Sequence, residues 1–146
     1  MLDHRWIARA GLSLLCGIQG IATMALDLNR THATNALWAR HARFHVVWQT
    51  LTVTLTSVVE LGLLWGGWVG VGMGFTLAML LASLSPIAFL ISFATERWFG
   101  GALSDPNGIP PLPVQMAGRV VKVDGNLAAV VAALVAMGLL GAIWRG

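Results

Sequence analysis

Apolar residues are gathered into four long blocks that are separated by shorter polar stretches. The blocks cover residues 6–26, 44–64, 68–93 and 121–144. Each is close to the ~20 residues that an α-helix needs to cross the hydrocarbon core of a bilayer. Helices are expected because lipid offers the backbone no hydrogen-bond partners, and no segment alternates like a barrel strand. The pattern predicts an all-α integral membrane four-helix bundle that forms one transmembrane domain over residues 1–146.

The composition fits a membrane protein. Hydrophobic residues make up 57% of the chain and charged residues only 10%, whereas soluble domains carry roughly 25% charged residues. The cations lie at the ends of the apolar blocks, so the net charge of +3 indicates contact with membrane lipids and argues against nucleic acid as a partner. The single cysteine, Cys16, excludes an intramolecular disulfide and a multi-cysteine metal cluster.

Four spans place both long loops, residues 27–43 and 95–120, on one side of the membrane and both termini on the other. The loop side carries six cations: Arg30, Arg40, Arg43, Arg97, Arg119 and Lys122. The terminal side carries three: Arg5, Arg9 and Arg145. The positive-inside rule therefore predicts that the long loops are cytoplasmic and that both termini lie outside. In a bacterium the membrane would be the plasma membrane.

Candidate catalytic residues surround the first long loop. They are Asp27, His32, His41 and His45. His41 and His45 are four residues apart, so in a helix they share one face. Histidine carries protons near neutral pH, and Asp27 could orient a histidine or stabilise its charge. The candidate substrate-binding residues, some arriving from the second long loop, are Asn29, Asn35, Trp38, Trp48, Gln49, Glu60, Glu96, Arg119 and Asp124.

A polar stripe runs the length of the second block. Its members are His41, His45, Gln49, Thr52, Thr56 and Glu60. At 100° per residue they stay within an arc of about 100°, so the stripe is predicted to face the bundle interior. Glu60 lies about 22 Å along the helix from His45, which makes it a separate group. Its alternative interpretation is a carboxyl group that burial keeps neutral.

The stretch over residues 27–45 resembles a group of small four-helix membrane proteins. These share a pattern D-x-N-x-T-H-x-x-N followed by a H-A-[RK]-F-H box. The matching positions are Asp27, Asn29, Thr31, His32, Asn35, His41, Ala42, Arg43, Phe44 and His45. The resemblance implies the four-helix fold and supplies no activity. The architecture is also similar to that of the sterol isomerase and sigma-2 receptor family, which has an acidic residue near the end of the first span, here Asp27.

These observations predict a membrane-embedded protein that binds a small lipophilic molecule in the bundle. An enzyme is favoured, using His/Asp acid–base chemistry of an isomerisation or hydration type. The sequence contains no nucleophile elbow, phosphate-binding glycine loop or nicotinamide fingerprint. Two other classes stay open. One is a proton-coupled small transporter that uses Glu60 as a homodimer, and the other is an accessory subunit of a larger membrane complex.

No cofactor is assigned from the sequence. A metal-dependent enzyme is an alternative, with ligands drawn from His41, His45, Asp27 and His32, because two histidines and a carboxylate can bind zinc or iron. Haem is not expected, since only one block contains a histidine. Structural roles compete with each assignment. The histidines could bond water at the membrane interface, Asp27 and Asn29 could cap a helix end, and Arg119 could anchor the chain at headgroups.

Overall fold

The computed structural model describes residues 3–116 and 118–146. In chain order its elements are α1 (His4–Asp27), α2 (Arg40–Trp65), α3 (Val71–Phe99), β1 (Leu112–Met116), β2 (Arg119–Val123) and α4 (Gly125–Arg145). The predicted all-α four-helix bundle is confirmed. All four helices are long and apolar enough to cross a membrane, as in an integral membrane protein.

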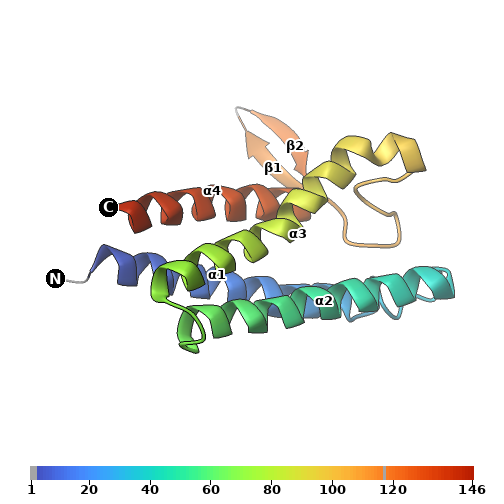
Figure 1. Ribbon diagram of the computed structural model, residues 1–146. Helices are drawn as coiled ribbons and strands as arrows, with labels where there is room; N and C mark the ends of the chain where they lie inside the picture. Colours follow the sequence, from blue (N-terminus) through green and yellow to red (C-terminus); the bar gives the residue numbers. More distant parts are fainter. Residues whose placement is uncertain (1–2, 117) are drawn as a thin grey trace.

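The helices form a ring in which sequential helices are neighbours. Helix α1 packs against α2 and α4, and α3 packs against α2 and, less extensively, against α4. Both chain termini lie at one end of the bundle, here called the terminal end (Figure 1). The opposite end carries the loops that follow α1 and α3 and is called the loop end. Both long loops therefore start from the same end of the bundle.

Local sequence fixes several helix ends. The carboxylate of Asp3 accepts from the backbone N–H of Arg5 at 3.1 Å and caps α1. Asp124 caps α4 in the same way, accepting from Leu127 N–H at 2.9 Å. Helix α3 is followed by its C-cap residue Gly100, whose φ of 68° is left-handed and suits glycine.

Two predicted span boundaries differ from the helix ends in the structure. The fourth span does not begin at residue 121, because residues 119–123 pair with β1 in an antiparallel hairpin and α4 begins only at Gly125. Asp124 is therefore the N-cap of α4 and does not lie inside the fourth span. The third helix continues to Phe99 instead of ending near residue 93, and Glu96 belongs to its last turn rather than to a loop.

The buried core is narrow and is concentrated toward the terminal end. It consists of Ala8, Leu12, Cys16, Leu64, Phe75, Ala78, Ala82 and Met137. The ring of Phe75 stacks on Trp144 with centroids 4.1 Å apart, which joins α3 to α4. The buried residues of α3 end at Pro86. Toward the loop end α3 diverges from α2 (Figure 1), so the bundle is closed at the terminal end and more open at the other.

Candidate functional site

The first long loop is held in place by its own polar side chains. The amide nitrogen of Asn29 donates to the carbonyls of Ala25 and Leu26, at 2.8 and 2.9 Å, and so covers the end of α1. The Asn29 side-chain carbonyl accepts from both the backbone N–H and the hydroxyl of Thr31, at 2.8 and 2.7 Å. Asn29 therefore caps α1 and forms the turn that follows, which is the structural role that was the alternative to ligand binding.

This network determines the tautomer of His32. The carbonyl oxygen of Asn29 can only accept, so the Thr31 hydroxyl donates to it. The Thr31 oxygen, 2.8 Å from Nδ1 of His32, must then accept from Nδ1–H. In a neutral His32 ring this leaves the Nε2 lone pair free. The Asp27 carboxyl group, at the loop end of α1, lies 3.4 Å from the Thr50 hydroxyl, and no ion pair joins it to His32 among the described residues.

The two long loops meet at Asn35. Its side chain is only 5% exposed, and its amide nitrogen donates to the backbone carbonyls of Thr31 and Asn107, each at 3.2 Å. Trp38 packs its ring edge to face against His32 at 5.2 Å. The indole N–H of Trp38 is buried and has no hydrogen-bond partner among the described residues. Asn35 and Trp38 thus build the loop core around His32.

The histidine box forms a second cluster at the start of α2. The Nε2 atoms of His41 and His45 are 3.0 Å apart. Both side chains are exposed, and the ring of His45 lies 5.7 Å from that of Trp48. At this distance one Nε2 carries a hydrogen and the other accepts it. In a neutral pair the remaining Nδ1 atoms are then one acceptor and one donor, so the two rings can take up a proton at one side and release one at the other.

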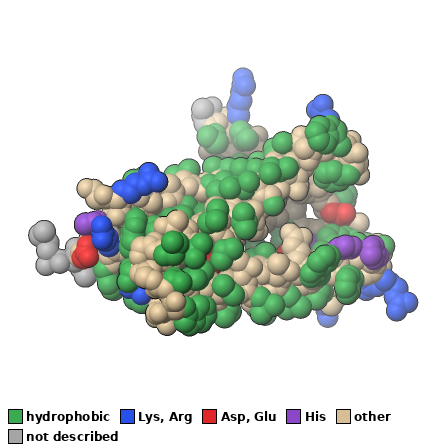
Figure 2. All heavy atoms as spheres, viewed as in Figure 1, with side chains coloured by type: hydrophobic (Ala, Val, Ile, Leu, Met, Phe, Trp, Pro, Cys, Tyr) green, Lys and Arg blue, Asp and Glu red, His purple; other side chains and the backbone are tan. Residues whose placement is uncertain are grey.

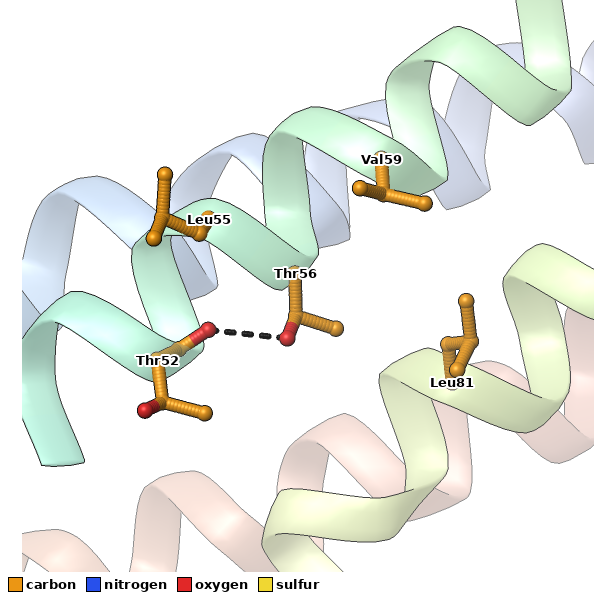
Figure 3. A pocket seen from close by; sticks show the side chains of 5 residues that line it. All are labelled: Thr52, Leu55, Thr56, Val59 and Leu81. Carbon is orange, nitrogen blue, oxygen red and sulfur yellow. Dashed lines mark hydrogen bonds between the residues drawn. The ribbon is translucent and has the colours of Figure 1, made fainter.

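A groove of about 290 Å³ lies between α2 and α3. Its lining residues are Thr52, Leu55, Thr56, Val59 and Leu81. The side chains of Thr56 and Leu81 point into the space between the two helices (Figure 3). Thr52 donates its hydroxyl hydrogen to the Trp48 carbonyl, and Thr56 donates to the Thr52 carbonyl. The hydroxyl oxygens therefore keep lone pairs that can accept from a bound molecule.

The groove and the histidine box occupy one face of α2. At 100° per residue, the α2 lining positions, His41 and His45 fall within an arc of about 100°. Histidine side chains are visible on the surface at the loop end of α2, next to the hollow between α2 and α3 (Figure 2). A second groove, about 410 Å³, lies between α3 and α4, but Arg145 at the terminal end is its only ionisable lining residue. Of these two grooves, the one beside α2 shares its helix face with the histidine pair, which lies about two turns from Thr52.

The prediction that the α2 stripe faces the bundle interior is wrong for most of its members. His41, His45, Gln49 and Thr52 are exposed, because the face toward α1 lies on the other side of the helix and carries Thr50 and Ser57. Glu60 alone is buried, with 1% of its surface exposed. The orientation of α2 about its own axis also separates Asp27 from His41 and His45. Asp27 lies 3.4 Å from the Thr50 hydroxyl, about 140° around the helix from His45.

Several predicted site residues do not join either cluster. Glu96 lies in α3 and Arg119 in β2, and no side-chain hydrogen bond or ion pair links these two or Asp124 to the candidate histidines in the described part of the chain. Within residues 3–116 and 118–146, no three His, Cys, Asp or Glu side chains are close enough together to hold a metal ion. The ligand set of His41, His45, Asp27 and His32 is therefore split between two places.

Sequence reasoning missed the polar face that α2 turns toward α1, formed by Thr50, Thr54 and Ser57. These residues recur at helical spacing, as the predicted stripe also does, so periodicity alone could not choose between the two faces. Burial of Gly20 and Cys16 on α1 opposite them is the deciding feature. Comparison with family models, curated proteins and solved structures gave no match for this chain.

Proposed function

We propose that this protein binds a small lipophilic molecule in the groove between α2 and α3 and acts on it by proton transfer at His41 and His45. The observation that carries the proposal is the shared face of α2, on which the histidine pair lies about two helical turns from the groove, toward the loop end. Ligand sites are typically apolar with a few convergent polar groups. Here the aliphatic side chains would hold the apolar part, and the polar part would lie toward the imidazoles.

The groove favours a ligand with a hydroxyl group. Thr52 and Thr56 offer only acceptor lone pairs, since their hydrogens are used by the backbone. A ligand alcohol could donate to either oxygen. Because the groove opens sideways between two spanning helices, the molecule would enter from the lipid. A lipophilic alcohol, or a compound isomerised or hydrated to one, matches this combination.

The histidine pair supports an acid–base step. One Nδ1 removes a proton from the bound molecule, and the Nε2–H of that ring passes to the second ring across the 3.0 Å contact. The second ring then returns its own Nδ1 proton to another position of the molecule. No proton is gained or lost overall, which is the requirement of an isomerisation. With water supplying the proton and hydroxyl, the same groups would serve a hydration.

The orientation in the membrane is part of the proposal. Six cations at the loop end against three at the terminal end favour cytoplasmic long loops and external termini. The histidine pair would then lie on the cytoplasmic side of the groove, since His41 and His45 are at the loop end of α2.

The test is to identify molecules that co-purify with the protein in mild detergent by native mass spectrometry. Thr56→Trp should fill the groove and remove the bound molecule. Val58→Trp is the matched control, because Val58 is 61% exposed and does not line the groove. Loss in Thr56→Trp with retention in Val58→Trp is the expected result. The same bound species in both variants would contradict the proposal.

A further inference from the structure

Helices α1 and α2 share a line of polar contacts, here called the α1–α2 seam. It comprises Cys16, Gly20 and Asp27 from α1 and Thr50, Thr54, Ser57 and Glu60 from α2. Thr50, Ser57 and Glu60 are each no more than 5% exposed. Polar side chains inside a membrane span are costly and usually mark a pathway or a site. None of these residues belongs to the groove or to the histidine box.

Glu60 is the least expected residue of the seam. Its carboxyl group is 1% exposed and lies beside the thiol of Cys16, which is fully buried. The second carboxyl oxygen, Oε2, has no hydrogen-bond partner among the described atoms. An ionised carboxylate in this position would have no compensating charge in contact with it. The position therefore suits a carboxyl group that holds a proton and can exchange it.

Few charged groups face Glu60. From α1 the ionisable neighbours are Cys16 and, about two turns closer to the terminal end, Arg9. The guanidinium of Arg9 donates to the Leu64 carbonyl and stacks on the Trp65 ring at 3.8 Å. Helices α3 and α4 carry ionisable side chains only at Glu96, Arg97 and Arg145, near their ends. Arg9 is thus the one cation near Glu60 within the described helices, and it is engaged elsewhere.

Toward the loop end, the hydroxyl groups of Thr50, Thr54 and Ser57 lie along the seam between Glu60 and Asp27, and each donates to the α2 carbonyl four residues earlier. Ser57 lies three residues before Glu60, about one turn closer to the loop end, and the Thr54 hydroxyl lies 3.4 Å from the Gly20 carbonyl and 2.9 Å from that of Thr50. The Thr50 hydroxyl is 3.4 Å from a carboxyl oxygen of Asp27. Thr50 and Glu60 are ten residues apart, which is about 15 Å of helix. Toward the terminal end the seam meets Arg9, whose fixed positive charge opposes passage of a proton.

We propose that Glu60 is a proton-binding site that is loaded from the loop end through the α1–α2 seam, with Asp27 at the entrance and Arg9 as the barrier at the terminal end. In the loading step a hydronium ion at Asp27 gives up a proton and becomes water, the proton forms an O–H bond with the Glu60 carboxylate, and release to water reverses the step. No oxidant, reductant or second substrate takes part. The site is independent of the groove, so either proposal can fail alone.

The experiment uses the fact that the chain has only two glutamates, Glu60 and Glu96. In a Glu96→Gln background with ¹³C-labelled glutamate, Glu60 is the only labelled residue with an acidic carboxyl group. Infrared spectroscopy of the full protein in a lipid film should show a protonated acid band at neutral pH. On transfer to D₂O this band should shift as the proton exchanges. A spectrum with only ionised carboxylate would overturn the proposal without any substitution at Glu60.

Matched double variants test the route. Thr50→Val with Thr54→Val removes two hydroxyls from the seam, and Thr52→Val with Thr56→Val removes two from the groove face of the same helix. The seam variant should slow exchange of the Glu60 proton by about tenfold or more, while the groove variant exchanges like the wild type. Equal exchange rates in the two variants, or an acid band that never exchanges, would overturn the proposed route.

Discussion

The side-chain amide of Asn35 donates a hydrogen bond at 3.2 Å to the backbone carbonyl of Asn107, 72 residues further along the chain. This contact joins the two long loops to each other at the loop end of the bundle, where Asp27 and His32 also lie. Asn35 is nearly fully buried, so its hydrogen bonds are made in a medium where an unmade bond is costly. The loop end is thus a folded layer and not a pair of free tethers.

Removing this link should destabilise the protein. Replacing Asn35 with Ala deletes the bonds that its side chain donates to Thr31 and Asn107 and the bond that it accepts from Leu37 N–H, at a combined cost of about 1–3 kcal/mol. The free energy of unfolding in detergent measures the effect. Asn29→Ala is a useful comparison, because it breaks the loop network at the end of α1 without touching the second loop. An Asn35→Ala protein as stable as the wild type would contradict the structural role.

Close packing of the α1–α2 seam gives a second prediction. A Cβ atom added at Gly20 would lie 2.9 Å from the Ser57 hydroxyl oxygen, whereas one at Gly17 meets nothing within 4 Å. Gly20→Ala should therefore lower the free energy of unfolding in detergent by roughly 1–3 kcal/mol, because the added methyl group overpacks the seam. Gly17→Ala, the control on the same helix, should be neutral or slightly stabilising because alanine favours the helix. Equal behaviour of the two variants would show that the seam is looser than described.

The histidine pair should act as a unit. Loss of either His41 or His45 removes the shared proton, so each alanine variant should lower turnover of the bound molecule by about 10²–10⁴-fold, and the double variant should be little worse than either single one. Turnover in lipid nanodiscs, once the co-purifying molecule is known, measures this. Full activity in the double variant, together with stable co-purification of other membrane proteins, would instead favour the accessory-subunit function.

Membrane orientation can be tested with the chain's own thiol as an internal reference. Cys16 is buried and should not react with a membrane-impermeant maleimide. A cysteine introduced at Asn107 should react only from the cytoplasmic side if the long loops are cytoplasmic. Labelling at this position in intact cells would show that the long loops are outside, which contradicts the predicted orientation but not the arrangement of the helices.

Much of the fold could be predicted from the sequence, and less of the site. Four apolar blocks of spanning length fix four helices, since lipid leaves the backbone no other arrangement. The pairing of residues 112–116 with 119–123 was missed because the valines of the second strand extend the apolar run of the fourth block. Periodicity placed His41, His45 and Glu60 on one face of the second helix. Only the packing against α1 shows that Glu60 is buried while the two histidines are exposed. A small rotation of α2 decides which polar groups meet, and sequence spacing does not determine it.

The most direct test of the ligand groove is photo-crosslinking with a long-chain alcohol that carries a diazirine in its chain, added to the protein in nanodiscs. The account predicts adducts concentrated on residues 52–59 of α2 and around Leu81 of α3, greatly reduced in Thr56→Trp and unchanged in Val58→Trp. Adducts spread evenly over all lipid-facing helix surfaces, or unaffected by Thr56→Trp, would contradict a binding site between α2 and α3.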